Sequence, residues 1–122
     1  MFGGRPLKVL VTDRVASEGI DLLRDSVDVD VKLGLNHDEL SEAIGDYDAL
    51  VVRSETQVPE SIIEKGHKLM VIGRAGTGVD NIDVDAATRK GIVVVNAPTG
   101  NTVSAAEHAV ALMLSLARYV PQ

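Results

Sequence analysis

Residues 69–96 read LMVIGRAGTGVDNIDVDAATRKGIVVVN and contain two strand-like runs with a helix-like segment between them. Both runs, residues 69–74 and 92–96, are short and apolar, as is typical of buried strands, and the second is the clearest of the chain. Residues 84–90 resemble a helix that ends at Gly91, because glycine readily adopts the left-handed conformation that often follows a helix. Two strands joined by a helix favour parallel pairing, since a parallel connection must cross the length of the sheet.

The rest of the chain repeats this alternation of strand-like and helix-like segments. Alternating valine and charged residues in 27–33 indicate a half-exposed strand near a sheet edge. Further strands are expected over residues 7–11 and 48–53, and further helices over 17–24, over 37–44 and after Pro59. Strands that alternate with short helices predict an α/β fold, here a flavodoxin-like parallel sheet with helices on both faces.

The last segment of the chain, residues 102–120, is expected to form a helix that begins at Asn101 or Thr102 and ends before Pro121. Residues 109–114 are all apolar, so this helix has apolar side chains on every face and must be buried on several sides. It is either a central helix of the same domain or one that needs a partner surface. We favour the partner surface and expect a homodimer through this helix.

Composition narrows the class of protein. The 122 residues carry a net charge of −6, and only 2% are aromatic, which disfavours a nucleic-acid partner or a membrane partner. No cysteine is present, which excludes disulfides and thiolate metal sites. The three histidines, His37, His67 and His108, lack the spacing of a zinc-binding helix. We expect no metal site and a cytoplasmic location.

The predicted strands end in groups that suit a small anion. Thr12-Asp13-Arg14 follows the first strand, Arg53-Ser54 the third, Arg74-Ala75-Gly76-Thr77-Gly78 the fourth and Asn96 the fifth. In a parallel sheet these ends share one edge, where ligands bind. Arginine forks match carboxylate or phosphate oxygens, and the amides of a glycine-rich loop can hold the same groups. The alternative for each arginine is a surface ion pair, and for the glycine loop an ordinary strand-to-helix turn.

Two other motifs do not carry the function that they suggest. The run Gly76-Thr77-Gly78-Val79-Asp80-Asn81 begins like a dinucleotide-binding fingerprint, but Asn81 stands where the third glycine should be. Glu107-His108 looks like an acid–base pair, yet adjacent residues of a helix point in different directions. A phosphate-receiver domain is also excluded, because it needs an aspartate and a lysine where this chain has Arg53 and Asn96.

Several of these segments closely resemble the D-3-phosphoglycerate dehydrogenases, a branch of the NAD-dependent D-2-hydroxyacid dehydrogenases. The resemblance runs from about Leu7 to the last residue, and residues 73–83 are its most specific part. It rests on VRSET (52–56), GRAGTGVDNID (73–83), AATRKGI (86–92), NAP (96–98) and NTVSAAEH (101–108). The pair Arg53-Ser54 favours the phosphoglycerate branch over the lactate and formate relatives.

The resemblance implies a role for each candidate residue. Arg53 and Ser54 would bind the substrate, 3-phosphoglycerate, with Arg74 near the same pocket. The amides of residues 75–78, including Ala75, Gly76 and Gly78, would hold its carboxylate. Thr77 would contact the nicotinamide side of NAD, and Asn101 would contact the substrate at a cleft between two domains.

The resemblance also implies an incomplete enzyme. Residues 1–98 would form the substrate-binding domain, and residues 99–122 the helix that crosses into a nucleotide-binding domain. The family's dinucleotide fingerprint, its acidic ribose-binding residue and its catalytic arginine, glutamate and histidine have no counterpart in these 122 residues. We therefore expect an oxidoreductase part with no catalytic residue of its own, inactive in isolation. The alternative is a stand-alone, non-catalytic anion-binding or dimerisation module.

Overall fold

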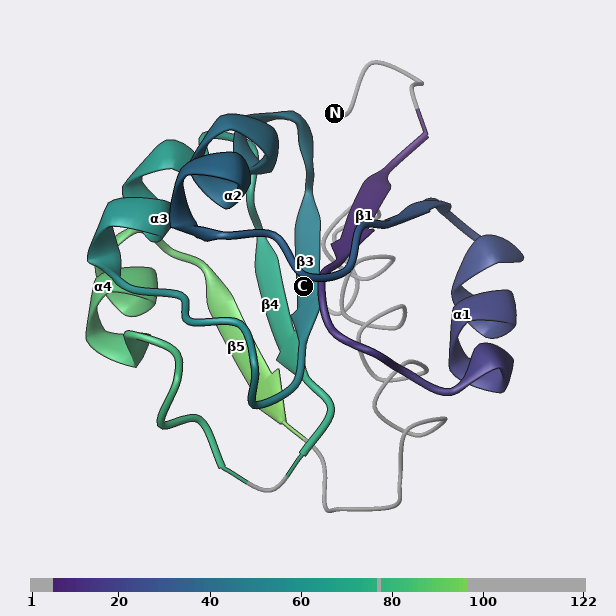
Figure 1. Cartoon of the computed structure of the whole chain (residues 1–122). Coiled ribbons are helices and arrows are strands. Elements are labelled where there is room, and N and C mark those ends of the chain that lie inside the picture. Colours follow the sequence, from purple (N-terminus) through teal and green to yellow (C-terminus); the bar gives the residue numbers. More distant parts are fainter. Residues whose placement is uncertain (1–5, 77, 97–122) are drawn as a thin grey trace.

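The computed structural model describes residues 6–76 and 78–96, which form a parallel β-sheet with helices on both faces (Figure 1). The sheet consists of β1 (Lys8–Val11), β2 (Asp28–Val31), β3 (Ala49–Val52), β4 (Val71–Arg74) and β5 (Val93–Asn96). These strands pair in the order β2-β1-β3-β4-β5, and every pairing is parallel. This is the flavodoxin-like order, so the predicted fold class is confirmed.

The helices are α1 (Ser17–Arg24), α2 (His37–Ala43), α3 (Glu60–Lys65) and α4 (Val84–Arg89), and a 3-10 turn, η1 (Ile44–Asp46), follows α2. Polar side chains begin two of them by accepting amide protons that a helix start leaves unpaired. Asn36 and Glu39 form a reciprocal capping box at α2, and Asp83 caps α4. Gly91 follows α4 with a φ of 75°, which confirms its predicted place at the helix end.

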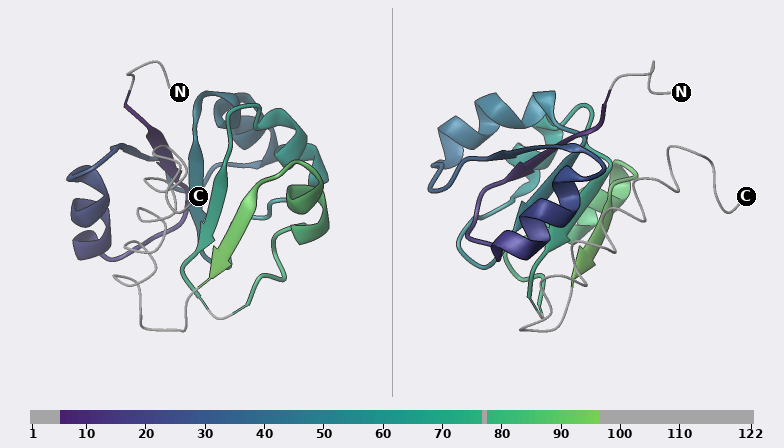
Figure 2. Two further views of the ribbon diagram at one scale, coloured as in Figure 1. Left: turned by 180° about the vertical axis from the view of Figure 1, so that it is seen from behind. Right: turned by 90° about the vertical axis from the view of Figure 1, so that its right-hand side faces the viewer.

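The two faces of the sheet have separate apolar cores, because successive residues of a strand point to opposite sides. Leu10 and Ile72 belong to the core under α2, α3 and α4. Val9 and Val71 belong to the core that includes residues of α1. Figure 2 shows α1 on one side of the sheet and the other three helices across it. The layers thus leave the two ends of the strands uncovered by these helices.

The two edge strands of the described sheet differ from expectation in one respect. β2 is mostly exposed, as its alternating sequence predicts. The strand predicted over residues 92–96 is confirmed as β5, but its expected burial is wrong, since Val93 is 38% exposed and Val94 and Val95 are half-buried. β3 is instead buried throughout, because strand order places it in the middle of the sheet and β5 at its end.

Some predictions fall on residues outside the described ranges. These are the helix over residues 102–120, and with it the expected division into residues 1–98 and 99–122. Within residues 6–76 and 78–96, the structure has no helix that is both long enough and apolar enough to cross a membrane.

Candidate functional site

The predicted anion-binding groups lie at one edge of the sheet, where β3, β4 and β5 end. Val52 is in register with Arg74, and Arg74 is in register with Asn96. Arg53 follows Val52 directly. The parallel pairing therefore brings the end of β3 beside the loop that follows β4, as the sequence predicts.

Arg53 has a fixed backbone and an exposed side chain. Its N–H donates to Asp13 Oδ2 at 2.7 Å, and its carbonyl accepts from Asn81 Nδ2 at 2.6 Å. Its guanidinium makes a long contact of 3.4 Å from Nη1 to the carbonyl of Arg14. Such a side chain can turn toward a ligand at little cost, while its attachment point stays in place. Ser54, the next residue, is also exposed.

Arg74 differs from Arg53 because it is buried. Its side chain is 10% exposed, and its Nη1 lies 3.4 Å from Asp80 Oδ1, a carboxylate that is 89% exposed. Its Nε donates to the Arg53 carbonyl, again at 3.4 Å. Both contacts are long, and an ion pair with one exposed partner contributes about 1 kcal/mol or less. The guanidinium thus retains the capacity to bind a further anion.

The glycine-rich loop after β4 is tightly packed against Arg74. A Cβ atom built at Gly78 would lie only 2.9 Å from Arg74 Nη1, so the absence of a side chain permits this approach. The Ala75 N–H donates to the Val52 carbonyl at 2.9 Å, and the Gly76 N–H to the Arg74 carbonyl at 2.9 Å. These two amides, expected to hold a carboxylate, therefore already have acceptors. Their role in anion binding stays a prediction that requires these bonds to be shared.

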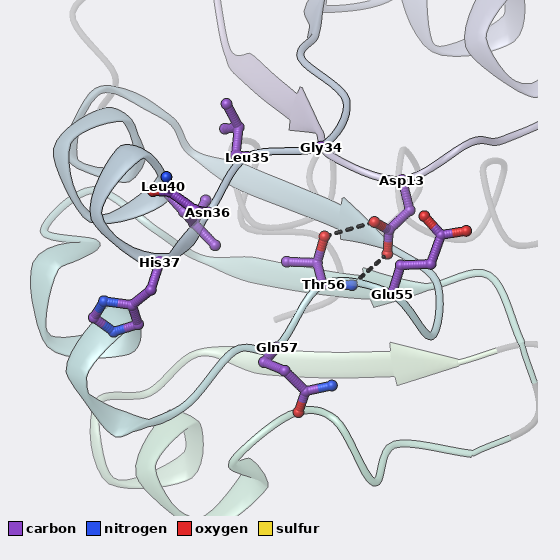
Figure 3. Close-up of a pocket in the computed structure, with 9 residues that line it drawn as sticks. All are labelled: Asp13, Gly34, Leu35, Asn36, His37, Leu40, Glu55, Thr56 and Gln57. Atoms are coloured by element: carbon purple, nitrogen blue, oxygen red, sulfur yellow. Dashed lines mark hydrogen bonds between the residues drawn. The ribbon is translucent and has the colours of Figure 1, made fainter.

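A buried polar cluster joins the ends of β1 and β3. Asp13 is 3% exposed, and its carboxylate accepts from the Arg53 N–H, the Thr56 N–H at 3.0 Å and the Thr56 hydroxyl at 2.6 Å. Thr56 Oγ1 also lies 3.0 Å from Thr12 Oγ1. Figure 3 shows Asp13 and Thr56 pointing toward one another. Thr56 was not singled out from the sequence as a site residue. No local pattern marks it as a hydrogen-bond partner of Asp13, which lies 43 residues away.

Asn81 ties the loop after β4 to the segment after β3. It is 6% exposed, and its Nδ2 donates to the carbonyls of Arg53 at 2.6 Å and Thr56 at 2.7 Å. The backbone carbonyl of Asn81 accepts from the Val58 N–H at 2.8 Å. Sequence reasoning considered Asn81 only as a departure from a dinucleotide fingerprint. The structure shows that its side-chain amide joins this loop to the segment after β3.

One atom of Asn81 stands out within the described part of the chain. Its Oδ1 is buried and has no hydrogen-bond partner there.

A cavity of about 290 Å³ lies next to the cluster (Figure 3). Its described lining includes the carboxylates of Asp13 and Glu55 and the ring of His37, and contains no lysine or arginine. Neither Arg53 nor Arg74 lines it. The cavity therefore does not coincide with the predicted anion site, which lies on the open edge of the sheet.

Two predicted site residues and the metal prediction still need to be placed. Thr77 and Asn101 lie outside the described residues. Among residues 6–76 and 78–96, no group of three or more histidine, aspartate or glutamate side chains could hold a metal ion. The assignment of Arg53, Arg74 and the loop after β4 to a small anion therefore stays a prediction.

The fold and this sheet edge define the class of protein. The chain belongs to the D-isomer specific 2-hydroxyacid dehydrogenases, since the model of that family's catalytic domain matches residues 9–120. Among curated proteins it is 57% identical over 114 residues to D-3-phosphoglycerate dehydrogenase of Synechocystis, and 53% identical over 117 residues to that of Archaeoglobus fulgidus. These matches cover 93% and 95% of the chain but only 21% and 22% of the relatives.

Solved structures agree with the fold. A crystal structure of a Pyrococcus horikoshii protein has a TM-score of 0.74 at 32% identity and covers 95% of this chain and 34% of that one. The NAD+-bound 3-phosphoglycerate dehydrogenase of Entamoeba histolytica has a TM-score of 0.67 at 30% identity, covering 91% of this chain and 39% of that one. The resemblance seen in the sequence is confirmed. The chain spans about a fifth of the length of the curated relatives it matches.

Proposed function

We propose that this chain is the substrate-binding part of a D-3-phosphoglycerate dehydrogenase. In the whole enzyme, a hydride would pass from C2 of 3-phosphoglycerate to NAD+, and the hydroxyl would lose its proton. The products are 3-phosphohydroxypyruvate, NADH and a proton, in the first step of serine biosynthesis. The proposal rests on two observations. Arg53 directly follows Val52, the register partner of Arg74, and Arg74 Nε donates to the Arg53 carbonyl, so both arginines lie where β3 and β4 end. The chain also resembles phosphoglycerate dehydrogenases over nearly all its length.

The chemistry of each side chain supports a division of labour. Arg53 is exposed, so it suits the terminal phosphate, which a guanidinium can bind through two hydrogen bonds. Arg74 is buried beside the glycine loop, so it suits the carboxylate end. Ser54 would add a hydroxyl donor, and the amides of Ala75, Gly76 and Gly78 would complete the carboxylate site.

The remaining parts of the proposal rest on the resemblance. Thr77 would contact the nicotinamide of NAD, and Asn101 the substrate. The helix over residues 102–120 would join two copies into a homodimer. The cytoplasmic location expected from the absence of cysteine stays a prediction.

We propose further that the 122-residue chain alone does not oxidise 3-phosphoglycerate. The catalytic arginine, glutamate and histidine of the family have no counterpart in it, and general acid–base catalysis alone supplies about 10²–10⁴-fold in rate. The purified chain, mixed with 3-phosphoglycerate and NAD+, should produce no NADH above background. Clear, substrate-dependent NADH formation would show that this chain holds a complete catalytic site.

Ligand binding tests the anion site directly. Arg53 and Ser54 are exposed, so charge pairs with Arg53 are screened by water, and we expect a dissociation constant of about 1 mM or weaker for 3-phosphoglycerate. Titration followed by NMR should shift the amide signals of residues 75–78. Arg53→Ala should weaken binding by about two- to fivefold, the contribution of one exposed charge pair. Binding that is unchanged in Arg53→Ala would contradict the assignment of this edge and favour a non-catalytic module.

A further inference from the structure

We infer that Asp13 and Asn81 are positioning residues that hold the segment Arg53–Thr56 in the shape that presents Arg53 and Ser54 to an anion. This inference rests on the proposed function, because it assigns these two side chains to the same anion site. Neither side chain needs to touch the ligand. Each acts on the backbone from which Arg53 extends.

Asp13 and Asn81 both form hydrogen bonds to the two ends of the four-residue segment Arg53–Thr56. Asp13 accepts the N–H groups of its first and last residues, Arg53 at 2.7 Å and Thr56 at 3.0 Å. Asn81 donates to the carbonyls of the same two residues, at 2.6 Å and 2.7 Å. One side chain follows β1 and the other follows β4, so the segment is held between two separate loops of the sheet edge. Ser54 and Glu55, between the two end residues, are exposed.

The chemistry of each side chain matches the backbone groups that it bonds. A carboxylate only accepts hydrogen bonds, and it meets N–H groups; the Nδ2 of an asparagine only donates, and it meets carbonyls. Asp13 and Asn81 are 3% and 6% exposed, so both are buried polar groups whose bonds serve this segment. The two side-chain bonds that Asn81 makes to this segment both come from its Nδ2 donor. Fixing a binding segment in advance reduces the entropy lost when the ligand binds.

The test measures binding of 3-phosphoglycerate by NMR titration of the 122-residue chain and of neutral or charge-changing variants. Asn81→Ala should weaken binding by about two- to fivefold, and no more than Arg53→Ala does, because it acts through Arg53. In the Arg53→Ala background, Asn81→Ala should cause no further loss, which is the mark of two coupled residues. The control is Asn36→Ala, the same chemical change at the cap of α2, which should lower the melting temperature and leave binding unchanged.

Asp13→Asn gives a second test that does not depend on Asn81→Ala folding. Removing a negative charge near an anion site should strengthen binding if electrostatics alone decided it. A positioning role predicts weaker binding instead, since the new amide group faces N–H donors. Hydrogen exchange of the Arg53 N–H should also become faster in this variant, with no ligand present.

The outcomes separate the two proposals. If Arg53→Ala weakens binding but Asn81→Ala and Asp13→Asn bind as tightly as the wild type or more tightly, the positioning role is overturned and the proposed function stands. An equal loss in Asn36→Ala, or an additive loss in the double variant, also overturns it. If the wild type does not bind 3-phosphoglycerate, or Arg53→Ala makes no difference, the anion site and its positioning residues are overturned together.

Discussion

At the scale of single residues, Arg74 shows how a buried cation depends on the residues that have no side chain. The loop after β4 passes closer to the Arg74 guanidinium at Gly78 than at Gly76. The two positions therefore differ in whether they can accept a side chain. A Cβ at Gly78 would meet Arg74 Nη1 at 2.9 Å and Asp80 Oδ1 at 3.3 Å, between the two partners of the ion pair. A Cβ at Gly76 would lie 3.8 Å from Arg74 Cζ, an ordinary van der Waals distance.

This difference predicts unequal effects of two alanine substitutions. Gly78→Ala should push the Arg74 guanidinium away from Asp80 and weaken 3-phosphoglycerate binding, while unfolding free energy falls by about 1 kcal/mol or less. Gly76→Ala, the matched control, should leave the Arg74–Asp80 contact in place, unfold like the wild type and weaken binding less than Gly78→Ala does. Titration and thermal unfolding of both variants provide the measurement. Equal binding by the two variants would show that Arg74 is not held by this loop.

Tyr47 is a second residue whose surroundings determine its chemistry. It is 3% exposed, and its hydroxyl donates to Asp30 Oδ2 at 2.6 Å. Burial first, and then the hydrogen bond to Asp30, raise the pKa of Tyr47 well above its ordinary value. The ammonium groups of Lys8 and Lys32 lie 5.0 and 5.9 Å from the ring centroid. The folded state thus favours the neutral phenol.

The raised pKa predicts how stability depends on pH. The contribution of the neutral phenol is complete below the unfolded pKa of about 10 and is lost as pH rises toward the folded value. Tyr47→Phe should lower the unfolding free energy by about 1 kcal/mol near neutral pH, because one hydrogen bond is lost. Above pH of about 10, the wild type should lose stability faster than the variant. Denaturant unfolding at a series of pH values checks this, and parallel curves would contradict it.

At the scale of elements, helix ends are determined by single residues. α2 begins at the capping box of Asn36 and Glu39, and α4 begins at Asp83 and ends before Gly91. The φ of 75° at Gly91 belongs to the left-handed region, where a side chain crowds the following carbonyl. No atom of the rest of the fold lies within 4 Å of a Cβ built there. The penalty for a side chain therefore comes from the local backbone conformation alone.

Gly91→Ala should therefore lower the unfolding free energy by about 1–2 kcal/mol. The control is Gly45→Ala in η1, where φ is not positive and the added Cβ would lie 3.4 Å from the Lys65 carbonyl oxygen. This control should change stability by less than about 0.5 kcal/mol. Chemical denaturation of both variants gives the comparison. A tolerant Gly91 would mean that the turn after α4 can rearrange without loss.

At the scale of the whole molecule, we expect the largely apolar segment of residues 102–120 to determine assembly. Burial of several hundred Å² of apolar surface between two copies would contribute on the order of 10 kcal/mol before association entropy is subtracted. We expect a homodimer through this helix; exchange of the helix between protomers is one way in which it could form. This expectation rests on the sequence, as the segment lies outside the described residues.

The dimer is tested by placing charges in the helix. Leu112→Glu combined with Leu116→Glu should give a monomer, or an insoluble protein if the segment also completes the fold. The control, Glu18→Gln on α1, should leave the mass in solution unchanged. Sedimentation of the wild type at about 100 μM should report a dimer. At this concentration, association with a micromolar dissociation constant is nearly complete. A monomeric wild type with a folded helix would contradict the expectation.

The sequence by itself determined the elements of this protein and their class. Strand and helix periods are local properties, and so are the stops at Gly91 and the charged alternation that marks the edge strand β2. Because the carboxyl ends of parallel strands meet at one edge, the sequence also predicted that Arg53 and the loop after Arg74 lie together.

Only the tertiary structure decided how that edge is held. Asp13 and Thr56 are 43 residues apart, and Asn81 and Arg53 are 28 apart, so no local pattern joins them. The bond from the Ala75 N–H to the Val52 carbonyl and the exposure of Val93 likewise depend on strand order. Buried polar groups must find partners wherever the chain brings them, and those partners exist only once all the strands have paired.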